Sequence, residues 1–371
     1  MYSPLNFIVW SLAHAYVLWR ILSLPFIKRR LQAPARRALG VALWVGLLGV
    51  NVLGHFAWMW LIRILEFIGT AWMAMILLIF ACLLAVELLT LFGTLFKSRV
   101  WIFQLLAVLA GFLLSGIALV QGLRPPVVHD YEIRLRGLPT ERDGLVVAVL
   151  ADTHIGNLIG ERWLTRRVVQ IQALRPDLIL LLGDIFEGRG EPAHRLLVQL
   201  HKLEAPLGVW AVAGNHEGRG DGTVSMERME LLGVHGLHDR WQEVCPGLIL
   251  AGVDDLTWRK RHGVKDDPIA KALFGRPPGA TIFLSHTPWG AEEAAALGAD
   301  LMLAAHTHGG QIWPFSYLVR LRYPLLAGRY DVNGMPVLVT RGAGTAGPRM
   351  RLWAPGEILR ITLRAAPADA P

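Results

Sequence analysis

The sequence of 371 residues is poor in cysteine, with only Cys82 and Cys245. Two cysteines cannot build a disulfide framework or a zinc ribbon, so no small stapled module is expected. The chain also lacks a basic stretch with interleaved aromatic residues, although its net charge is +8. Its basic residues are scattered or flank apolar runs, so nucleic acid is not expected to be the main partner.

Charged residues are absent from three long stretches near the N-terminus, which are residues 40–62, 67–86 and 100–123. Each has about the twenty residues that a bilayer crossing requires. A fourth candidate, residues 6–27, is interrupted by His14 and Arg20. It lacks the positive region and the cleavage site of a signal peptide. Repeated apolar runs of this length argue against a soluble helical bundle.

Basic residues are distributed unevenly among the connections between these segments. Lys28, Arg29, Arg30, Arg36 and Arg37 precede the second segment, Lys97 and Arg99 lie between the third and fourth, and Arg63 alone lies between the second and third. Positive loops stay in the cytoplasm, so the last span is expected to lead to the extracytoplasmic face. We therefore predict a multi-pass region of the cell membrane with three to four spans over residues 1–123. Residues 124–144 are a linker and first strand that keep the next domain close to the bilayer.

From residue 145 onward, short apolar runs alternate with turn residues and amphipathic stretches. The predicted buried strands are residues 145–151, 178–182, 208–213, 248–253, 281–285, 301–304 and 336–340. Residues 164–174 and 193–203 have helical spacing. Strands that alternate with helices predict an α/β domain over residues 145–365, with a site where the strands end.

Metal-binding residue types follow five of these predicted strands. They are Asp152, His154, Asp184, Asn215, His216, Glu217, His286, His306 and His308. One Asp or His after a strand is more often a cap than a ligand, but five such strand ends in a chain with 13 histidines indicate a metal site. Carboxylate, imidazole and amide groups without thiolate suit manganese, iron or zinc. Their number suits two divalent ions about 3.5–4 Å apart.

The order Asp-x-His, Gly-Asp, Gly-Asn-His-Glu, a lone His and His-x-His resembles the calcineurin-like metallophosphoesterase signature. Residues 340–345 (Thr-Arg-Gly-Ala-Gly-Thr) and 355–358 (Pro-Gly-Glu-Ile) are similar to the membrane-attached branch called transmembrane protein with metallophosphoesterase domain. The resemblance covers residues 145–365 and implies a four-layer α/β/β/α sandwich. Ala305 departs from the family's usual glycine. A methyl group is expected to be tolerated there if the backbone angles are ordinary.

The resemblance also implies a role for each candidate residue. Asp152, His154 and His308 would hold the first metal, Asn215, His286 and His306 the second, and Asp184 would bridge them. His216 would face the substrate, with Glu217 nearby to orient its imidazole. Two such ions lower the pKa of a shared water and neutralise phosphoryl oxygens. Water can then attack phosphorus directly, without a covalent enzyme intermediate.

The implied activity is hydrolysis of a phosphodiester or pyrophosphate bond, and the substrate and oligomeric state stay open. Aromatic or apolar residues follow the candidate ligands, namely Trp289, Ile312, Trp313, Phe315, Tyr317 and Leu318. They either pack in the core or at the bilayer interface, or form a rim that accepts a lipid-linked phosphate. The membrane-attached branch includes UDP-2,3-diacylglucosamine pyrophosphatases of lipid A synthesis. Such a reaction requires a cytoplasmic site, in conflict with the predicted orientation.

Two alternatives without hydrolysis agree less well with these observations. A membrane binding module that merely kept the fold would have no reason to keep seven candidate ligands and His216. A transporter or channel would need polar groups along its spans. The notable ones in or beside the spans are His55, Glu87 and Arg20, too few for an ion path.

Overall fold

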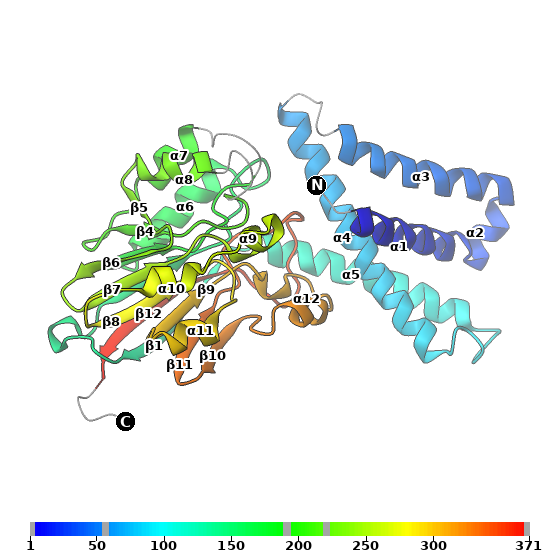
Figure 1. Ribbon diagram of the computed structural model, residues 1–371. Coiled ribbons are helices and arrows are strands. Elements are labelled where there is room, and N and C mark those ends of the chain that lie inside the picture. Colours follow the sequence, from blue (N-terminus) through cyan, green and yellow to red (C-terminus); the bar gives the residue numbers. More distant parts are fainter. Residues whose placement is uncertain (1–3, 54–58, 188–193, 218–222, 367–371) are drawn as a thin grey trace. The chain divides into compact units, whose positions relative to one another are not determined.

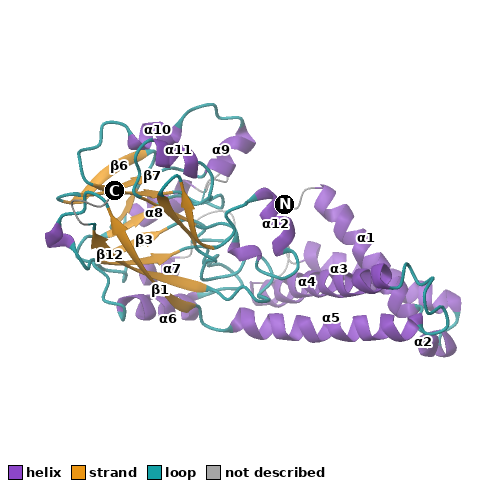
Figure 2. Ribbon diagram, turned by 90° about the horizontal axis from the view of Figure 1, so that it is seen from below, coloured by secondary structure: helices purple, strands orange, loops and turns teal. Residues whose placement is uncertain are grey.

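The computed structural model describes residues 4–53, 59–187, 194–217 and 223–366 (Figures 1 and 2). The chain divides into two compact units. The first comprises residues 1–123 together with residues 347–353, and the second comprises residues 124–346 and 354–371. The first is helical, whereas the second contains all the strands of the described residues.

The helical unit consists of α1 (Pro4–Leu22), α2 (Pro25–Arg30), α3 (Ala33–Leu53), α4 (Met59–Leu89) and α5 (Val100–Leu123). Within the described residues, Arg63–Leu89 and Val100–Leu123 are long and apolar enough to cross a membrane, and Phe7–Leu22 is a shorter apolar stretch. The prediction of a boundary between spans at residues 62–67 is wrong, because α4 continues through Arg63 and Glu66. Residues 54–58 of the predicted span 40–62, including His55, lie outside the described residues.

Two polar residues of α1, Tyr16 and Arg20, are paired within this unit. The Arg20 guanidinium lies 2.6 Å from Oε1 of Glu87 on α4. Tyr16 and Gln104 donate hydrogen bonds of 3.1 and 3.2 Å to the same oxygen. A charge in an apolar bundle is tolerated when it is paired and hydrogen-bonded in this way. The arginine that interrupts the first apolar segment is therefore compatible with a place in the bundle.

The direction of α1 follows from two of its contacts with α4. The Trp72 indole lies 3.3 Å from Nε2 of His14, and Arg20, further along α1, reaches Glu87, further along α4. The two helices are therefore parallel. Since α2 follows α1 and the connection to α5 follows α4, the basic residues of these two segments lie at the same end of the helical unit (Figure 2).

Two six-stranded sheets form the second unit, with strand orders β1-β12-β2-β3-β4-β5 and β10-β11-β9-β8-β7-β6. The strands of the first sheet are β1 (Val127–Leu135), β2 (Val146–Leu150), β3 (Leu178–Leu181), β4 (Val209–Ala211), β5 (Val234–Gly236) and β12 (Glu357–Ala365). Those of the second are β6 (Arg240–Cys245), β7 (Leu248–Gly252), β8 (Ala280–Leu284), β9 (Leu301–Ala304), β10 (Gly328–Val332) and β11 (Met335–Val339).

Both faces of the central strands are buried, which explains their continuous apolar runs. In β2, Val147 and Val149 face the other sheet, whereas Ala148 and Leu150 face helices. The helices over the first sheet are α6 (Glu161–Gln172), α7 (His194–Leu200) and α8 (Thr223–Glu230), and those over the second are α10 (Pro268–Leu273) and α11 (Ala291–Ala296) (Figure 1). The predicted α/β/β/α sandwich is confirmed. Two further helices, α9 (Leu256–His262) and α12 (Ser316–Arg322), follow strand ends of the second sheet.

The predicted strands correspond to β2, β3, β4, β7, β8, β9 and β11. The final strand, β12, lies between β1 and β2 and was not predicted. Val127, the first residue of β1, pairs with Glu357, while Leu359 pairs with Val149 near the end of β2. The chain therefore enters this unit at the end of the sheet where β2 finishes and the candidate ligands begin.

Candidate metal centre

The candidate ligands follow the carboxyl ends of parallel strands in both sheets. In the first sheet, Asp152 and His154 follow β2, Asp184 follows β3, and Asn215 and His216 follow β4. In the second sheet, His286 follows β8, and His306 and His308 follow β9. Because parallel strands finish at one edge of a sheet, these loops converge.

Five candidate ligands adopt a left-handed backbone conformation that is uncommon for residues with a side chain. They are Asp152 (φ 49°), His154 (47°), Asp184 (50°), His306 (72°) and His308 (51°). Such a conformation costs on the order of 1–3 kcal/mol and persists where the surrounding structure imposes it, often at functional sites. The fold therefore holds these side chains in directions that relaxed loops would not choose.

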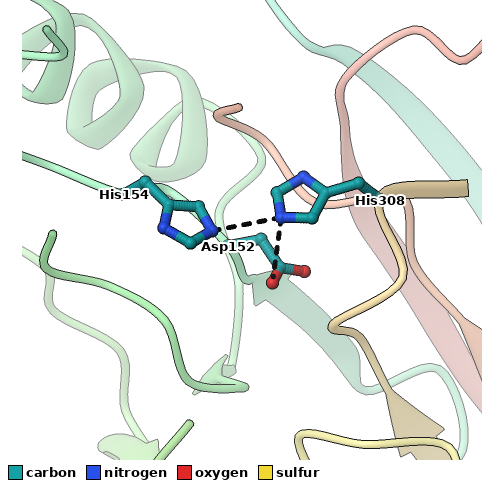
Figure 3. A group of neighbouring side chains, drawn as sticks. All are labelled: Asp152, His154 and His308. Carbon is teal, nitrogen blue, oxygen red and sulfur yellow. Dashed lines mark hydrogen bonds and ion pairs between the residues drawn. The ribbon is translucent and has the colours of Figure 1, made fainter. Parts of the chain in front are cut away.

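Asp152, His154 and His308 form the first group, whose ligand atoms all lie within 4.8 Å of one another (Figure 3). Nε2 of His308 lies 3.1 Å from Nε2 of His154 and 3.5 Å from Oδ1 of Asp152. Figure 3 shows the three side chains pointing toward one another. Ligands about 2.0–2.1 Å from one ion lie roughly 3 Å apart when they meet at right angles, so these spacings suit a single metal.

The second group contains Asp184, His286 and His306. Nε2 of His286 lies 3.3 Å from Oδ2 of Asp184 and 3.2 Å from Nδ1 of His306. The same Asp184 oxygen is 3.8 Å from Nε2 of His154, a member of the first group. This carboxylate therefore lies between the two groups.

Two buried oxygen atoms at the centre accept no hydrogen bond from the described part of the chain, Oδ1 of Asp152 and Oδ1 of Asn215. Asp152 is fully buried, and Asn215 is 4% exposed. A buried acceptor without a donor is costly unless another positive group meets it. The orphaned oxygens and the donor set together fit divalent cations.

The titratable groups of the centre strongly shift one another's pKa values. Burial raises the pKa of Asp184, but His286, His216 and His154 outweigh it and hold that pKa well below its usual range. Burial lowers the pKa of His286, yet Asp184 brings it well above the usual value. Burial raises the pKa of Asp152 to about 6. Buried carboxylates that need nearby positive charge are typical of a cation site.

Glu217 has a different task from the one predicted. Its carboxylate accepts hydrogen bonds from four backbone amides, at 2.7 Å from Asp184, 2.8 Å from Ile185, 3.1 Å from Phe186 and 2.9 Å from Gly214. It thereby joins the loop after β3 to the loop after β4. Glu217 shapes the backbone that carries Asp184 and Asn215.

The carboxylate beside the imidazole of His216 is that of Glu187, which we did not predict. Oε2 of Glu187 lies 3.3 Å from Nδ1 of His216 and 2.5 Å from Nδ1 of His154. Burial raises the pKa of Glu187, but its bond to His154 reverses the effect and lowers that pKa overall. The one available signal was a second acidic residue three positions after Asp184.

Tyr323, just past α12, is a further residue of the centre that we did not predict. Its hydroxyl lies 2.8 Å from Nε2 of His306, whose Nδ1 faces the second group. Its ring stacks on Trp289 at 5.6 Å between centroids. A hydrogen bond to the far nitrogen of a ligating imidazole fixes its tautomer and orientation.

The glycines of residues 340–345 are explained by close approach to Asp152. A Cβ on Gly342 would lie 2.4 Å from Cβ of Asp152, and one on Gly344 would lie 2.1 Å from the Thr153 carbonyl oxygen. Side chains there would displace the Asp152 loop. Ala305 is fully buried, and its backbone is outside the left-handed region. This is the condition under which a methyl group in place of the family's glycine was expected to be tolerated.

Residues 145–310 match the family model described as calcineurin-like phosphoesterase. The chain contains a calcineurin-like phosphoesterase domain. A Danio rerio protein named "Transmembrane protein with metallophosphoesterase domain" is 32% identical over 273 residues, which are 70% of this chain and 62% of that protein. The Bos taurus protein of the same name is 31% identical over 283 residues, 71% of this chain and 62% of that protein. This chain therefore spans less than two thirds of the length of these relatives.

The phosphoesterase domain also resembles a solved structure. The dimetal phosphatase of Danio rerio is 13% identical and aligns with a TM-score of 0.34 over 54% of this chain and 88% of that one. Among bacterial proteins, an uncharacterised metallophosphoesterase of Campylobacter jejuni is 28% identical over 267 residues, 71% of this chain and 70% of that protein.

Proposed function

We propose that this chain is a membrane-anchored phosphoesterase with two divalent metal ions, which hydrolyses phosphodiester or pyrophosphate bonds. The observation that carries the proposal is that Asp184 joins two groups of ligand atoms, each spanning no more than 4.8 Å, as a member of the second group and 3.8 Å from Nε2 of His154 in the first. In this assignment Asp152, His154 and His308 hold one ion, Asn215, His286 and His306 hold the other, and Asp184 bridges them. Manganese, iron and zinc all suit these ligands.

Two such ions, when bound, supply a water of near-neutral pKa and positive charge for the phosphoryl oxygens. His216 acts on the substrate in this proposal. Its side chain is 17% exposed, and its Nε2 lies 3.9 Å from Oδ2 of Asp184. With Nδ1 held by Glu187, the imidazole can present a proton on Nε2 to a phosphoryl or leaving-group oxygen.

We further propose that the domain lies on the extracytoplasmic face of the cell membrane. The support is the parallel arrangement of α1 and α4, which brings the basic residues after each helix to one end of the helical unit. If this end is cytoplasmic, α5 leads outward. An export-dependent phosphatase fused after Pro371 should then be active, whereas a reporter that fluoresces only in the cytoplasm should stay dark. The reverse pair of results would contradict this orientation.

The substrate class proposed here is a lipid-linked phosphate or pyrophosphate. The support is that Tyr323, which contacts His306, stacks on Trp289 and so places two aromatic rings beside the second ligand group. The test is hydrolysis by the full-length protein, loaded with manganese, of phosphomonoesters, nucleotide diesters and lipid pyrophosphates. Turnover of a lipid substrate at least about tenfold above its water-soluble analogue is expected. Absence of metal-dependent hydrolysis from the whole panel would contradict the proposed activity.

A further inference from the structure

The short helix α12 exposes an unusual set of apolar side chains. Tyr317 and Leu318 are each 64% exposed and Leu321 is 82% exposed, and Trp313 just before the helix is 37% exposed. Positions 317, 318 and 321 lie on one side of a helix. The same short helix connects two parts of the metal centre, since it follows the His308 loop and leads into Tyr323.

Basic residues accompany this apolar face. Arg320 and Arg322 of α12 are exposed, as is Lys260 at the end of α9. The charged groups of Arg322 and Lys260 lie 4.8 and 5.2 Å from the ring centre of Trp289. A short segment that combines aliphatic, aromatic and cationic side chains matches the composition that binds the interface of anionic membranes.

The two other most exposed apolar residues among the described residues of the domain do not belong to such a set. Phe274 is 84% exposed and Leu231 is 75% exposed. They precede β8 and β5, so each lies at the end of the strands opposite to the metal centre. Single exposed apolar residues are ordinary on protein surfaces, whereas a cluster indicates an interaction site.

The chain itself restricts what can cover this surface. Only Arg124, Pro125 and Pro126 separate the apolar helix α5 from β1, a connection that reaches on the order of 11–14 Å. Because β1 begins at the end of the sheet that carries the ligand loops, the domain's attachment point and its metal centre share one end. A bilayer is therefore within reach of this end, and its anionic lipids complement the three cations Lys260, Arg320 and Arg322.

We propose that α12 docks on the bilayer, with Tyr317, Leu318 and Leu321 in the headgroup region and the neighbouring cations on anionic lipid headgroups. This surface would bring the metal centre toward the level at which lipid phosphates lie. The inference concerns a binding surface, so it does not depend on hydrolysis.

The test places a nitroxide label on the full-length protein in vesicles. In a background with Cys82→Ala and Cys245→Ala, Leu321→Cys carries the label, and Phe274→Cys is the matched control at the opposite end of the strands. Phosphatidylcholine vesicles with and without phosphatidylglycerol are compared. Accessibility to oxygen relative to a water-soluble nickel complex should be about tenfold higher at position 321 than at position 274 in the anionic vesicles.

Replacing the cations tests the electrostatic part. The ratio of membrane-inserted to water-exposed label in anionic vesicles should fall by roughly fivefold in each of three variants, Lys260→Gln, Arg320→Gln and Arg322→Gln. Lys202→Gln, an exposed lysine before β4, should leave it unchanged. A label at position 321 that is as accessible to the nickel complex as that at position 274 would overturn the proposal. Equal protection of the label at position 321 from the nickel complex in detergent and in vesicles would also overturn the proposal, because it would indicate a contact with protein instead of lipid.

Discussion

The two sheets of the phosphoesterase domain contribute different chemistry to the same centre. The first sheet provides both carboxylates and the amide, in Asp152, Asp184 and Asn215, together with His154. The second provides imidazoles only, from His286, His306 and His308. Each proposed ion takes ligands from both sheets. In this proposal the first sheet would neutralise the charge of the ions, and the second would complete the ligand set of each.

The apolar layer between the sheets contains none of the candidate ligands. Val149, Leu180, Leu250 and Ile282 are almost completely buried in one continuous cluster from both sheets. Burial of that size holds the layers together. The two regions therefore have different roles. The core fixes the distance between the sheets, whereas the loops with the candidate ligands lie at one end of the sheets.

The largest expected effect follows from removing the shared charge of the first sheet. Asp184→Asn should lower metal-dependent hydrolysis by roughly a thousandfold or more, because the carboxylate that serves both ions is lost. Initial rates with saturating manganese measure the effect. Asp130→Asn, a carboxylate on β1 whose side chain is 67% exposed, is the control and should keep wild-type activity. An Asp184→Asn variant with normal rates would sink the bridging assignment.

His216 should separate chemistry from metal binding. His216→Ala should lose roughly a hundredfold in turnover while retaining both ions, because the imidazole acts on substrate. Glu187→Gln should lose less, since it orients the His154 and His216 rings without touching substrate. Turnover numbers and metal analysis of the same preparations distinguish the cases. If His216→Ala lost one ion, His216 would instead be a ligand.

On the side of the second sheet, Tyr323 should act through His306. Tyr323→Phe removes the hydroxyl 2.8 Å from Nε2 of His306. The affinity for the second metal ion should fall by roughly tenfold. Calorimetric titration with manganese would show the change in one of two binding steps. Tyr131→Phe, on β1, should change neither step. Equal affinities in Tyr323→Phe and the wild type would assign this tyrosine a packing role alone.

The smallest effect concerns a contact between the sheets away from the metals. His238, after β5 of the first sheet, bonds Asp254, after β7 of the second, at 2.9 Å. This bond chiefly raises the pKa of His238. Its stabilisation is full below the unfolded pKa of about 6.5 and disappears as pH rises through the folded value.

Because this histidine is well exposed, His238→Gln should lower the melting temperature by only about 1–2 °C near pH 5.5. At pH 9 the variant and the wild type should melt together. Thermal unfolding at the two pH values checks this, and a difference that grows with pH would have the wrong sign.

The candidate ligands could be predicted because each follows an apolar run that can only be a buried strand. The direction in which each side chain points could not be predicted. Glu217 adjoins His216 in the sequence, yet its carboxylate turns to four backbone amides, whereas Glu187 comes from another loop to meet the imidazole. Tyr323 follows a helix whose position is set by tertiary packing, so no local pattern connects it to His306.

The two units differ in how well the ends of their helices and strands could be predicted. In the phosphoesterase domain, turn residues follow the strands and mark their ends. In the helical unit, Arg63 and Glu66 looked like a connection between two spans, but charges alone do not end a helix, and α4 continues through them. The place of β12 between β1 and β2 depends on pairing between residues more than 200 positions apart, such as Val127 with Glu357.

The claim that two ions are shared between the sheets is tested most directly by counting metal. The full-length protein is stripped with a chelator, reloaded with manganese and analysed by mass spectrometry, alongside His308→Ala and His286→Ala, which remove one second-sheet ligand from each group. We predict two ions per chain in the wild type and one in each variant, with unchanged far-ultraviolet circular dichroism. A single ion in the wild type, or two ions in both variants, would contradict a dinuclear centre completed by the second sheet.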